Sequence, residues 1–134
     1  MAGDRPPVWA QAESVLVVDL VADAASVGTA RAFIAAALAT RDASAAHIAD
    51  VVLVASELVT NAVRYGVGPV EVALQLGAHR TGVDVAADGG PPSSVRFGEQ
   101  DTAGYGLRIV DALSAGWGAY GQGSSTHVWA QIPR

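Results

Sequence analysis

A column of polar side chains interrupts an apolar segment near the middle of the chain. In the stretch ASELVTNAVRYG, Glu57, Asn61 and Tyr65 follow one another at intervals of four residues. Residues four apart lie on one face of a helix, so these three side chains would line up along it. A carboxylate accepts protons and hydrogen bonds, and an amide offers both an acceptor oxygen and N–H donors. Taken alone, this spacing is more typical of the polar edge of a half-exposed helix than of a site.

Two glycine-containing segments follow, and each permits the backbone to come close to a ligand. In AGYGLRIV, Gly104 and Gly106 precede a helical pattern, and the start of a helix offers unpaired N–H groups to anions. The other segment, DGG, follows a predicted strand and includes Asp88 and Gly90. In isolation, an ordinary helix entry and an ordinary turn would explain them. The order and spacing of all three segments are the stronger signal.

The hydrophobic pattern predicts the elements that must position these residues. The patterns are a strand over 13–21, a helix over 26–38, a helix capped by Ser44 and ended by Gly66, strands over 69–77 and 83–88, a helix over 106–116, and a strand over 125–133. One more strand fits before the last, and 89–105 reads as a loop. This order predicts an α+β fold, a two-layer sandwich with a mixed, mainly antiparallel sheet and helices on one face.

Composition limits the class of protein. The 134 residues carry a formal charge of −5, which argues against direct nucleic-acid binding, because phosphate contacts need a basic face. The chain has no cysteine, which excludes disulfides and thiolate metal sites. Apolar runs are short or broken by charge and a signal-peptide pattern is absent, so we expect a cytoplasmic protein without a membrane span. We expect a flexible N-terminus over 1–12 and a single domain over 13–134.

The three histidines do not suggest a metal site. His47 and His79 have no partner at ligand spacing, and we expect both at the surface. His127 alternates away from the apolar face of its predicted strand.

Four segments together resemble the GHKL (Bergerat) ATP-binding fold. They are ELVTNAVRYG, a strand that ends near DGG-P, GYGLRIVDALSAGWG and the terminal THVWAQIP. The most similar branch is that of the anti-sigma-factor serine/threonine kinases and related small actinobacterial regulators. The resemblance extends from about Val15 to the end of the chain.

The resemblance implies ATP and Mg²⁺ as cofactors and assigns roles on the first helix motif. Asn61 matches the asparagine whose side-chain oxygen binds the Mg²⁺ that bridges the ATP phosphates, which suits a cation that prefers oxygen ligands. Glu57 matches the general base, one helical turn before the metal ligand. In the kinases this residue would take the proton from a serine or threonine hydroxyl of a partner protein.

The glycine segments and the last strand also acquire roles from the resemblance. Gly104 and Gly106, followed by Leu107, match the second glycine box, whose backbone would hold the phosphates. Residues 90–103 match a lid over the nucleotide. Thr126 matches a threonine or small residue of the last strand, with a register uncertain by one position.

Two positions depart from the family pattern. Tyr65 stands where histidine or a similar residue is usual, and tyrosine retains a planar group and a donor. The aspartate that recognises adenine should follow Val85 by two residues, but Ala87 is there. Asp88 lies one residue later, on the opposite face by strict alternation, unless a bulge turns it inward with Gly90 as the motif glycine. Without that bulge, the acceptor for the adenine amino group is missing.

The resemblance implies an ATP-binding anti-sigma factor and protein serine/threonine kinase. Its partners would be a sigma factor and an anti-anti-sigma protein of the STAS type, and homodimers are common in this branch. An alternative is a protein-interaction regulator that binds ATP weakly or not at all, with a degenerate pocket. The ATPase half of a histidine kinase is disfavoured, because no phosphoacceptor-histidine helix pair precedes the ATP-binding part.

Overall fold

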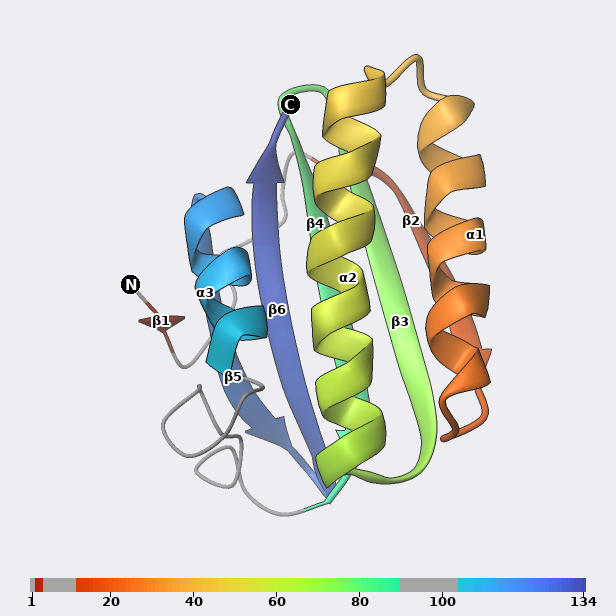
Figure 1. Cartoon of the computed structure of the whole chain (residues 1–134), viewed down its shortest axis with the longest axis vertical. Coiled ribbons are helices and arrows are strands. Elements are labelled where there is room, and N and C mark those ends of the chain that lie inside the picture. The colour runs from red at the N-terminus through yellow and green to blue at the C-terminus, as the bar shows by residue number, and fades with distance from the viewer. Residues whose placement is uncertain (1, 4–11, 90–103) are drawn as a thin grey trace.

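The structure, a computed structural model, describes residues 2–3, 12–89 and 104–134. It is a six-stranded sheet with three helices on one face (Figure 1). The elements are β1 (Ala2–Gly3), β2 (Ala12–Leu20), α1 (Ala25–Ala39), α2 (Ala45–Tyr65), β3 (Val67–Gly77), β4 (Arg80–Asp88), α3 (Gly104–Leu113), β5 (Gly116–Gln122) and β6 (Ser125–Pro133). The order across the sheet is β1-β5-β6-β4-β3-β2, antiparallel except for the β1–β5 pair. The predicted fold class is confirmed.

The long helix α2 has the boundaries that its terminal residues predict. The Ser44 side chain accepts a hydrogen bond from the His47 backbone amide at 3.1 Å, which satisfies one of the free donors at the helix start. The helix ends at Tyr65, and Gly66 then turns the chain into β3 with its amide donating to Ala62 O at 2.8 Å. A serine cap and a glycine stop therefore set the length of the helix that carries the polar column.

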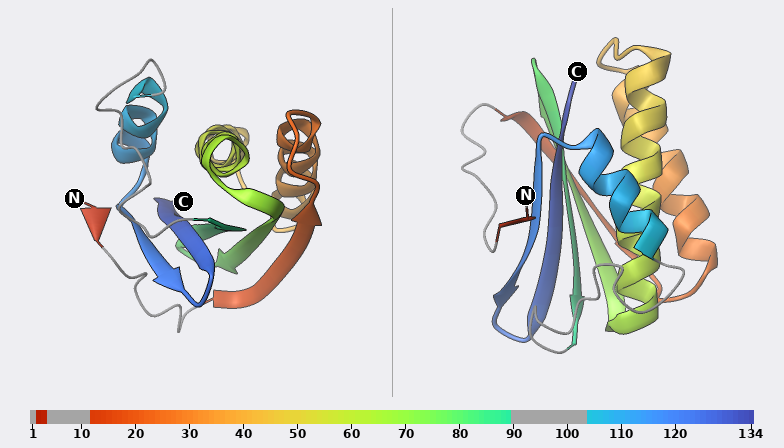
Figure 2. Two further views of the ribbon diagram at one scale, coloured as in Figure 1. Left: turned by 90° about the horizontal axis from the view of Figure 1, so that it is seen from below. Right: turned by 60° about the vertical axis from the view of Figure 1, so that its left-hand side comes forward.

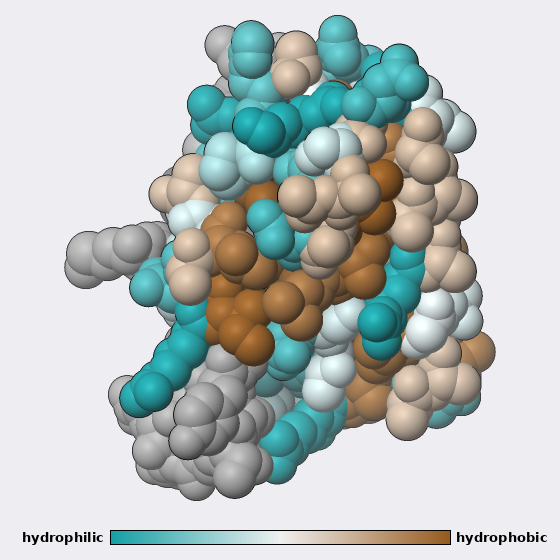
Figure 3. Space-filling view, turned by 45° about the horizontal axis from the view of Figure 1, so that its top comes forward, coloured by the Kyte–Doolittle hydropathy of each residue, from teal (hydrophilic) through white to brown (hydrophobic). Residues whose placement is uncertain are grey.

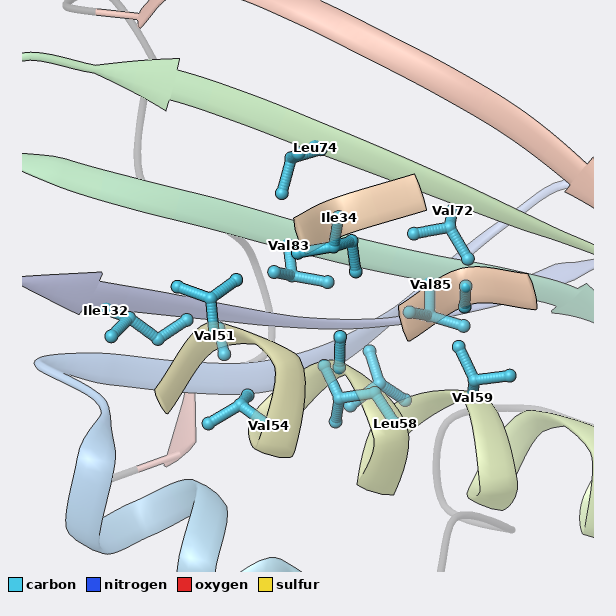
Figure 4. Close-up of a cluster of buried hydrophobic side chains, with 14 of the residues drawn as sticks. Ile34, Val51, Val54, Leu58, Val59, Val72, Leu74, Val83, Val85 and Ile132 are labelled. Carbon is cyan, nitrogen blue, oxygen red and sulfur yellow. The ribbon is translucent and has the colours of Figure 1, made fainter. Parts of the chain in front are cut away.

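The hydrophobic core lies between the helices and the sheet. Large side chains from both layers are fully buried there and face one another in Figure 4, among them Ile34, Val51, Leu58, Val59, Val72, Leu74, Val83, Val85 and Ile132. Burial of each such side chain stabilises the fold by about 1.5–3 kcal/mol. Because α2 packs along the middle of the sheet, this core fixes the position of its polar column relative to β4 and β6.

The two faces of the sheet have different surroundings. All three helices lie on the same face, as the two views in Figure 2 show. Among the described residues no helix covers the opposite face, which we call the open face. It carries the alternate residues of each strand, including Asp19, Glu71, Asp84 and His127. On the helical side, Figure 3 shows apolar surface gathered in the middle and polar side chains at the upper end.

The additional strand that the sequence pattern allows before the last one is present as β5. Strand β5 has the sequence GWGAYGQ, in which glycines replace the bulky residues that make strand alternation visible. It forms because it pairs with β6 from Gly116↔Gln131 to Gln122↔Ser125. Helix α3 accordingly ends at Leu113, three residues earlier than the pattern predicts. Ala2–Gly3, within the segment expected to be flexible, pair with Trp117–Gly118; residues 1 and 4–11 of that segment lie outside the described residues.

The expectation that His47 lies at the surface is wrong. His47 is 5% exposed, and its Nδ1 donates to the Pro133 carbonyl at 3.1 Å while Nε2 accepts from the Thr81 hydroxyl at 2.8 Å. Spacing along α2 could not reveal this, because both partners come from strands far away in the sequence. His79 is exposed, as predicted, and His127 lies on the open face, as predicted.

Helix α2 also bears on the question of a membrane span. By length and composition alone it would be sufficient to cross a membrane. It packs against the sheet, however, and its Val51, Val54 and Leu58 are fully buried in the core. Its apolar character is therefore explained by its place in this fold.

Candidate functional site

A cleft lies between the C-terminal end of α2 and the ends of β4 and β6. Its lining combines apolar strand residues with polar groups from the helix and the strand ends: Asn61, Ala62, Tyr65, Gly66, Val85, Ala87, Asp88, Gly89, Thr126 and Val128. Helix, strand end and turn thus bring together residues from three parts of the sequence. The polar groups at its edge and the apolar floor are the usual composition of a small-molecule site.

Helix α2 places the polar column along this cleft. Asn61 and Tyr65 line it, and both are half-buried. Glu57 is half-buried one helical turn further from the cleft. Within residues 12–89 and 104–134, the side chains of Glu57 and Asn61 make no hydrogen bond, so the carboxylate and the amide remain available to a ligand. Arg64 lies over the Tyr65 ring, 5.5 Å from its centroid, at the same end of the helix.

The second glycine segment forms the start of α3. Helix α3 begins at Gly104, so Gly104 and Gly106 belong to its first turn, and the helix packs beside α2 (Figure 1). Amides of a first turn have no partner within their helix and can donate to phosphate. The backbone of Leu107 lies in the same turn. Gly90 and the predicted lid, residues 90–103, lie outside the described residues.

Ala87 occupies the position where the family pattern places the adenine-binding acid. It lies on the helical side of β4, buried in the floor of the cleft. The pairing of β4 with β6 runs without a shift from Arg80↔Pro133 to Asp88↔Ser125, so the bulge that would turn Asp88 inward is absent from this pair. The Asp88 carboxylate lies at the rim and accepts hydrogen bonds from the hydroxyls of Ser124 and Ser125 at 3.2 and 3.1 Å.

Thr126 completes the wall of the cleft. It pairs with Ala87 on β4 and with Gly121 on β5, which places it on the helical side of the sheet. In this register Thr126, and not His127, borders the cleft.

One polar cluster escaped the sequence reasoning altogether. Asp84, Tyr120 and His127 meet on the open face, where they hydrogen-bond to one another. The only signal in the sequence is the alternation that sends His127 and Asp84 away from the core. Their contact depends on the order of the strands, in which β4 and β5 flank β6.

Comparison with known proteins assigns this fold to a class of domain. Residues 20–132 match the model of the histidine kinase-like ATPase domain, and the chain belongs to that family. Among solved structures, it is similar to the RsbU and RsbW domains of Rv1364c from Mycobacterium tuberculosis, with 24% identity and a TM-score of 0.70. The match covers 90% of this chain and 33% of that one, so this chain spans about a third of the length of the chain it matches. A comparison with curated proteins gives no match.

The described residues suit the phosphate end of the implied nucleotide better than its base end. At the phosphate end, the free amide of Asn61 and the first-turn backbone of α3 are suitable for a cation and for phosphate oxygens. At the base end, the floor position is Ala87, and the nearest carboxylate, that of Asp88, is hydrogen-bonded to two serines. The phosphate end therefore fits, whereas none of the described residues places a carboxylate in the floor of the cleft as an acceptor for the adenine amino group.

Proposed function

We propose that this protein is a Mg²⁺- and ATP-dependent serine/threonine kinase that also acts as an anti-sigma factor. The observation that carries the proposal is the pair on α2: Asn61 on the wall of the cleft and Glu57 one turn away on the same helix face. Both side chains are half-buried, make no hydrogen bond with the described residues, and follow the order of the family motif. A purely structural helix edge would not require an amide facing a cleft.

In the proposed reaction the chain's own residues position and move a proton. Asn61 would hold Mg²⁺ through its amide oxygen, and backbone amides of the first turn of α3 would hold phosphate oxygens. Glu57 would accept the proton of a substrate serine or threonine hydroxyl as that oxygen becomes a nucleophile. When bound, Mg·ATP supplies the transferable phosphoryl group, and catalysis then depends largely on alignment and charge neutralisation.

The proposed partners are a sigma factor and an anti-anti-sigma protein of the STAS type. Support comes from the family assignment and from the similarity to a structure whose description names an RsbW domain beside an RsbU domain. The net charge of −5 also favours protein partners over direct nucleic-acid binding.

Isothermal titration of the protein with Mg·ATP tests the proposal at its first step. We expect saturable binding that weakens when Mg²⁺ is removed with a chelator, because Asn61 would then lose the cation that it shares with the phosphates. Absence of heat at high protein concentration, together with an unchanged thermal midpoint in millimolar Mg·ATP, would contradict the proposal.

A second candidate function is a regulator that binds partners without nucleotide. The unshifted pairing of β4 with β6 and the alanine at position 87 favour it, because among the described residues no carboxylate lies in the floor of the cleft. It predicts partner binding of equal strength with and without Mg·ATP. Tightening of a partner complex by Mg·ATP would exclude it in favour of the kinase.

A further inference from the structure

A partly buried cluster on the open face joins three neighbouring strands. The carboxylate of Asp84 on β4 accepts two hydrogen bonds: one oxygen lies 2.8 Å from His127 Nδ1 on β6, and the other lies 2.9 Å from the Tyr120 hydroxyl on β5. The Tyr120 hydroxyl is also 3.1 Å from His127 Nδ1, and the two rings stack with centroids 4.6 Å apart. The Asp84 and His127 side chains are only 11% and 16% exposed.

The strand register explains why these three side chains meet. His127 pairs with Tyr120 on one side and with Ala86 on the other. Asp84 lies two residues before Ala86 and therefore on the same face of β4, diagonal to His127. The small Ala86 side chain leaves the histidine and the carboxylate room to approach each other. The cluster thus connects the β5–β6 hairpin to the centre of the sheet through side chains as well as through the backbone.

The charged residues around His127 are acidic among the described residues. Asp84 contacts it directly, and Asp19, Glu71 and Asp88 line the hollow that His127 borders. No arginine lines this hollow in the described part of the chain. The hydrogen bond to Asp84 raises the pKa of His127 above its ordinary value, and the charges of Asp84 and Glu71 add to this effect against the opposing cost of burial. Burial and Asp84 raise the pKa of Tyr120 as well, so its hydroxyl remains a donor.

We propose that Asp84, Tyr120 and His127 form a proton-controlled clamp, which holds the β5–β6 hairpin to β4 while His127 is protonated and loosens when the proton leaves. A protonated imidazole hydrogen-bonded to a buried carboxylate forms a charge-assisted pair. When the imidazole loses its proton, Asp84 accepts hydrogen bonds from two neutral donors only. The clamp is a property of the sheet and does not depend on the proposed nucleotide binding. It is adjacent to the cleft nonetheless, because Thr126 and Asp88 flank it on the same strand ends.

The direction of the pH effect follows from the shift. A histidine whose pKa is higher in the folded than in the unfolded state stabilises the fold fully below 6.5, the ordinary value. That contribution disappears as the pH rises through the folded-state pKa. The clamp is therefore closed below pH 6.5 and opens as the pH rises through the folded-state pKa of His127.

The first test is an NMR titration of the imidazole resonances, which needs no ligand and has only three histidines to assign. We expect His127 to titrate above 6.5, Asp84→Asn to lower its pKa, and Tyr120→Phe to raise it, because the carboxylate then loses a competing donor. A merely structural cluster would not produce opposite shifts in the two variants. A pKa of His127 at or below 6.5 in the native protein, or shifts in the same direction, would overturn the proposal.

Hydrogen exchange measures the consequence for the hairpin. We expect the protection factors of the β5–β6 amides, after correction for intrinsic exchange, to decrease between pH 6 and 9 by about tenfold for each pH unit by which the His127 pKa is raised. His127→Gln should abolish this decrease, and His79→Gln, an exposed control, should preserve it. If Asp84→Asn does not fold, the histidine and tyrosine variants still decide the matter. Protection that follows the same pH course in His127→Gln as in the native protein would contradict the clamp.

Discussion

Gly66 and Ala87 touch at the point where the end of α2 meets strand β4. A Cβ built on Gly66 would lie 2.7 Å from the Ala87 Cβ and 2.6 Å from the Ala62 carbonyl oxygen. The glycine that ends the helix is therefore needed for close packing as well as for chain reversal, and the alanine opposite it forms the floor of the candidate cleft. The fit between helix end and strand is consequently sensitive to single methyl groups.

We expect Gly66→Ala to lower the free energy of unfolding by about 1–3 kcal/mol, because the added methyl group must displace backbone or Ala87. Gly28→Ala is the matched control: nothing lies within 4 Å of its added Cβ in the interior of α1, so helix propensity should stabilise the protein by up to about 1 kcal/mol. Urea denaturation of both variants measures the difference. Equal changes in the free energy of unfolding for the two substitutions would show that the end of α2 is not tightly packed against β4.

We expect Asn61→Ala to weaken Mg·ATP binding by at least about tenfold, which corresponds to about 1.4 kcal/mol, while ATP in excess chelator binds both proteins alike. The reason is that the amide oxygen acts through the cation. Titration calorimetry with and without Mg²⁺ gives the comparison, and Thr60→Ala, an exposed neighbour on α2, is the control. A loss of equal size without Mg²⁺ would mean that Asn61 contacts the nucleotide itself.

We expect Glu57→Gln to reduce phosphoryl transfer to a serine-bearing STAS protein by about 10²- to 10⁴-fold, because the amide cannot accept the hydroxyl proton. Binding of Mg·ATP and thermal stability should remain close to native values. Transfer of labelled phosphate measures the effect. Glu71→Gln, an exposed carboxylate on the open face, should retain full activity, and a Glu57→Gln protein as active as this control would exclude Glu57 as the base.

We expect Asp88→Ala to leave Mg·ATP affinity within about threefold, a change well below 1.4 kcal/mol. The Asp88 carboxylate is held by Ser124 and Ser125 at the rim rather than in the floor. Competition between ATP and GTP on the native protein adds a second readout, because a site without a carboxylate acceptor should discriminate weakly between purines. A tenfold loss of ATP affinity in Asp88→Ala would instead identify Asp88 as the adenine ligand that the family pattern suggests.

We expect the stability of the fold to fall as the pH drops below 6.5, in part because of His47. Burial, followed by the nearby charge of Arg134, lowers the pKa of His47. Between the folded-state pKa and 6.5, His47 is therefore protonated in the unfolded state and neutral in the folded state. Stability from this group is present above 6.5 and is lost as the pH falls toward the folded-state pKa. Urea denaturation between pH 5 and 7 measures the slope, which should flatten in His47→Gln but persist in His79→Gln. An unchanged slope in His47→Gln would assign acid sensitivity to other groups.

The histidines His47 and His127 illustrate why some of the chemistry cannot be predicted from the sequence. They have opposite pKa shifts, yet Thr81 and Pro133, which contact His47, and Asp84, which contacts His127, lie far away in the chain. Pro133 and Thr81 reach His47 through the strand ends, and Asp84 reaches His127 through the order of the sheet. Local spacing contains no information about such contacts, because they arise only when distant strands pair.

The sequence by itself determined the elements and the polar column on α2. Ser44 and Gly66 bound the helix, four-residue spacing aligns Glu57 with Asn61, and alternating residues mark strands β3, β4 and β6. These are local effects of backbone hydrogen bonding and side-chain period, so they can be recognised without the fold. Tertiary structure alone decided that Ala87 forms the floor of the cleft while Asp88 remains at its rim, that GWGAYGQ is a strand, and that an acid, a tyrosine and a histidine meet on the open face. Strand register and sheet order control these contacts, and both depend on packing between residues far apart in the chain.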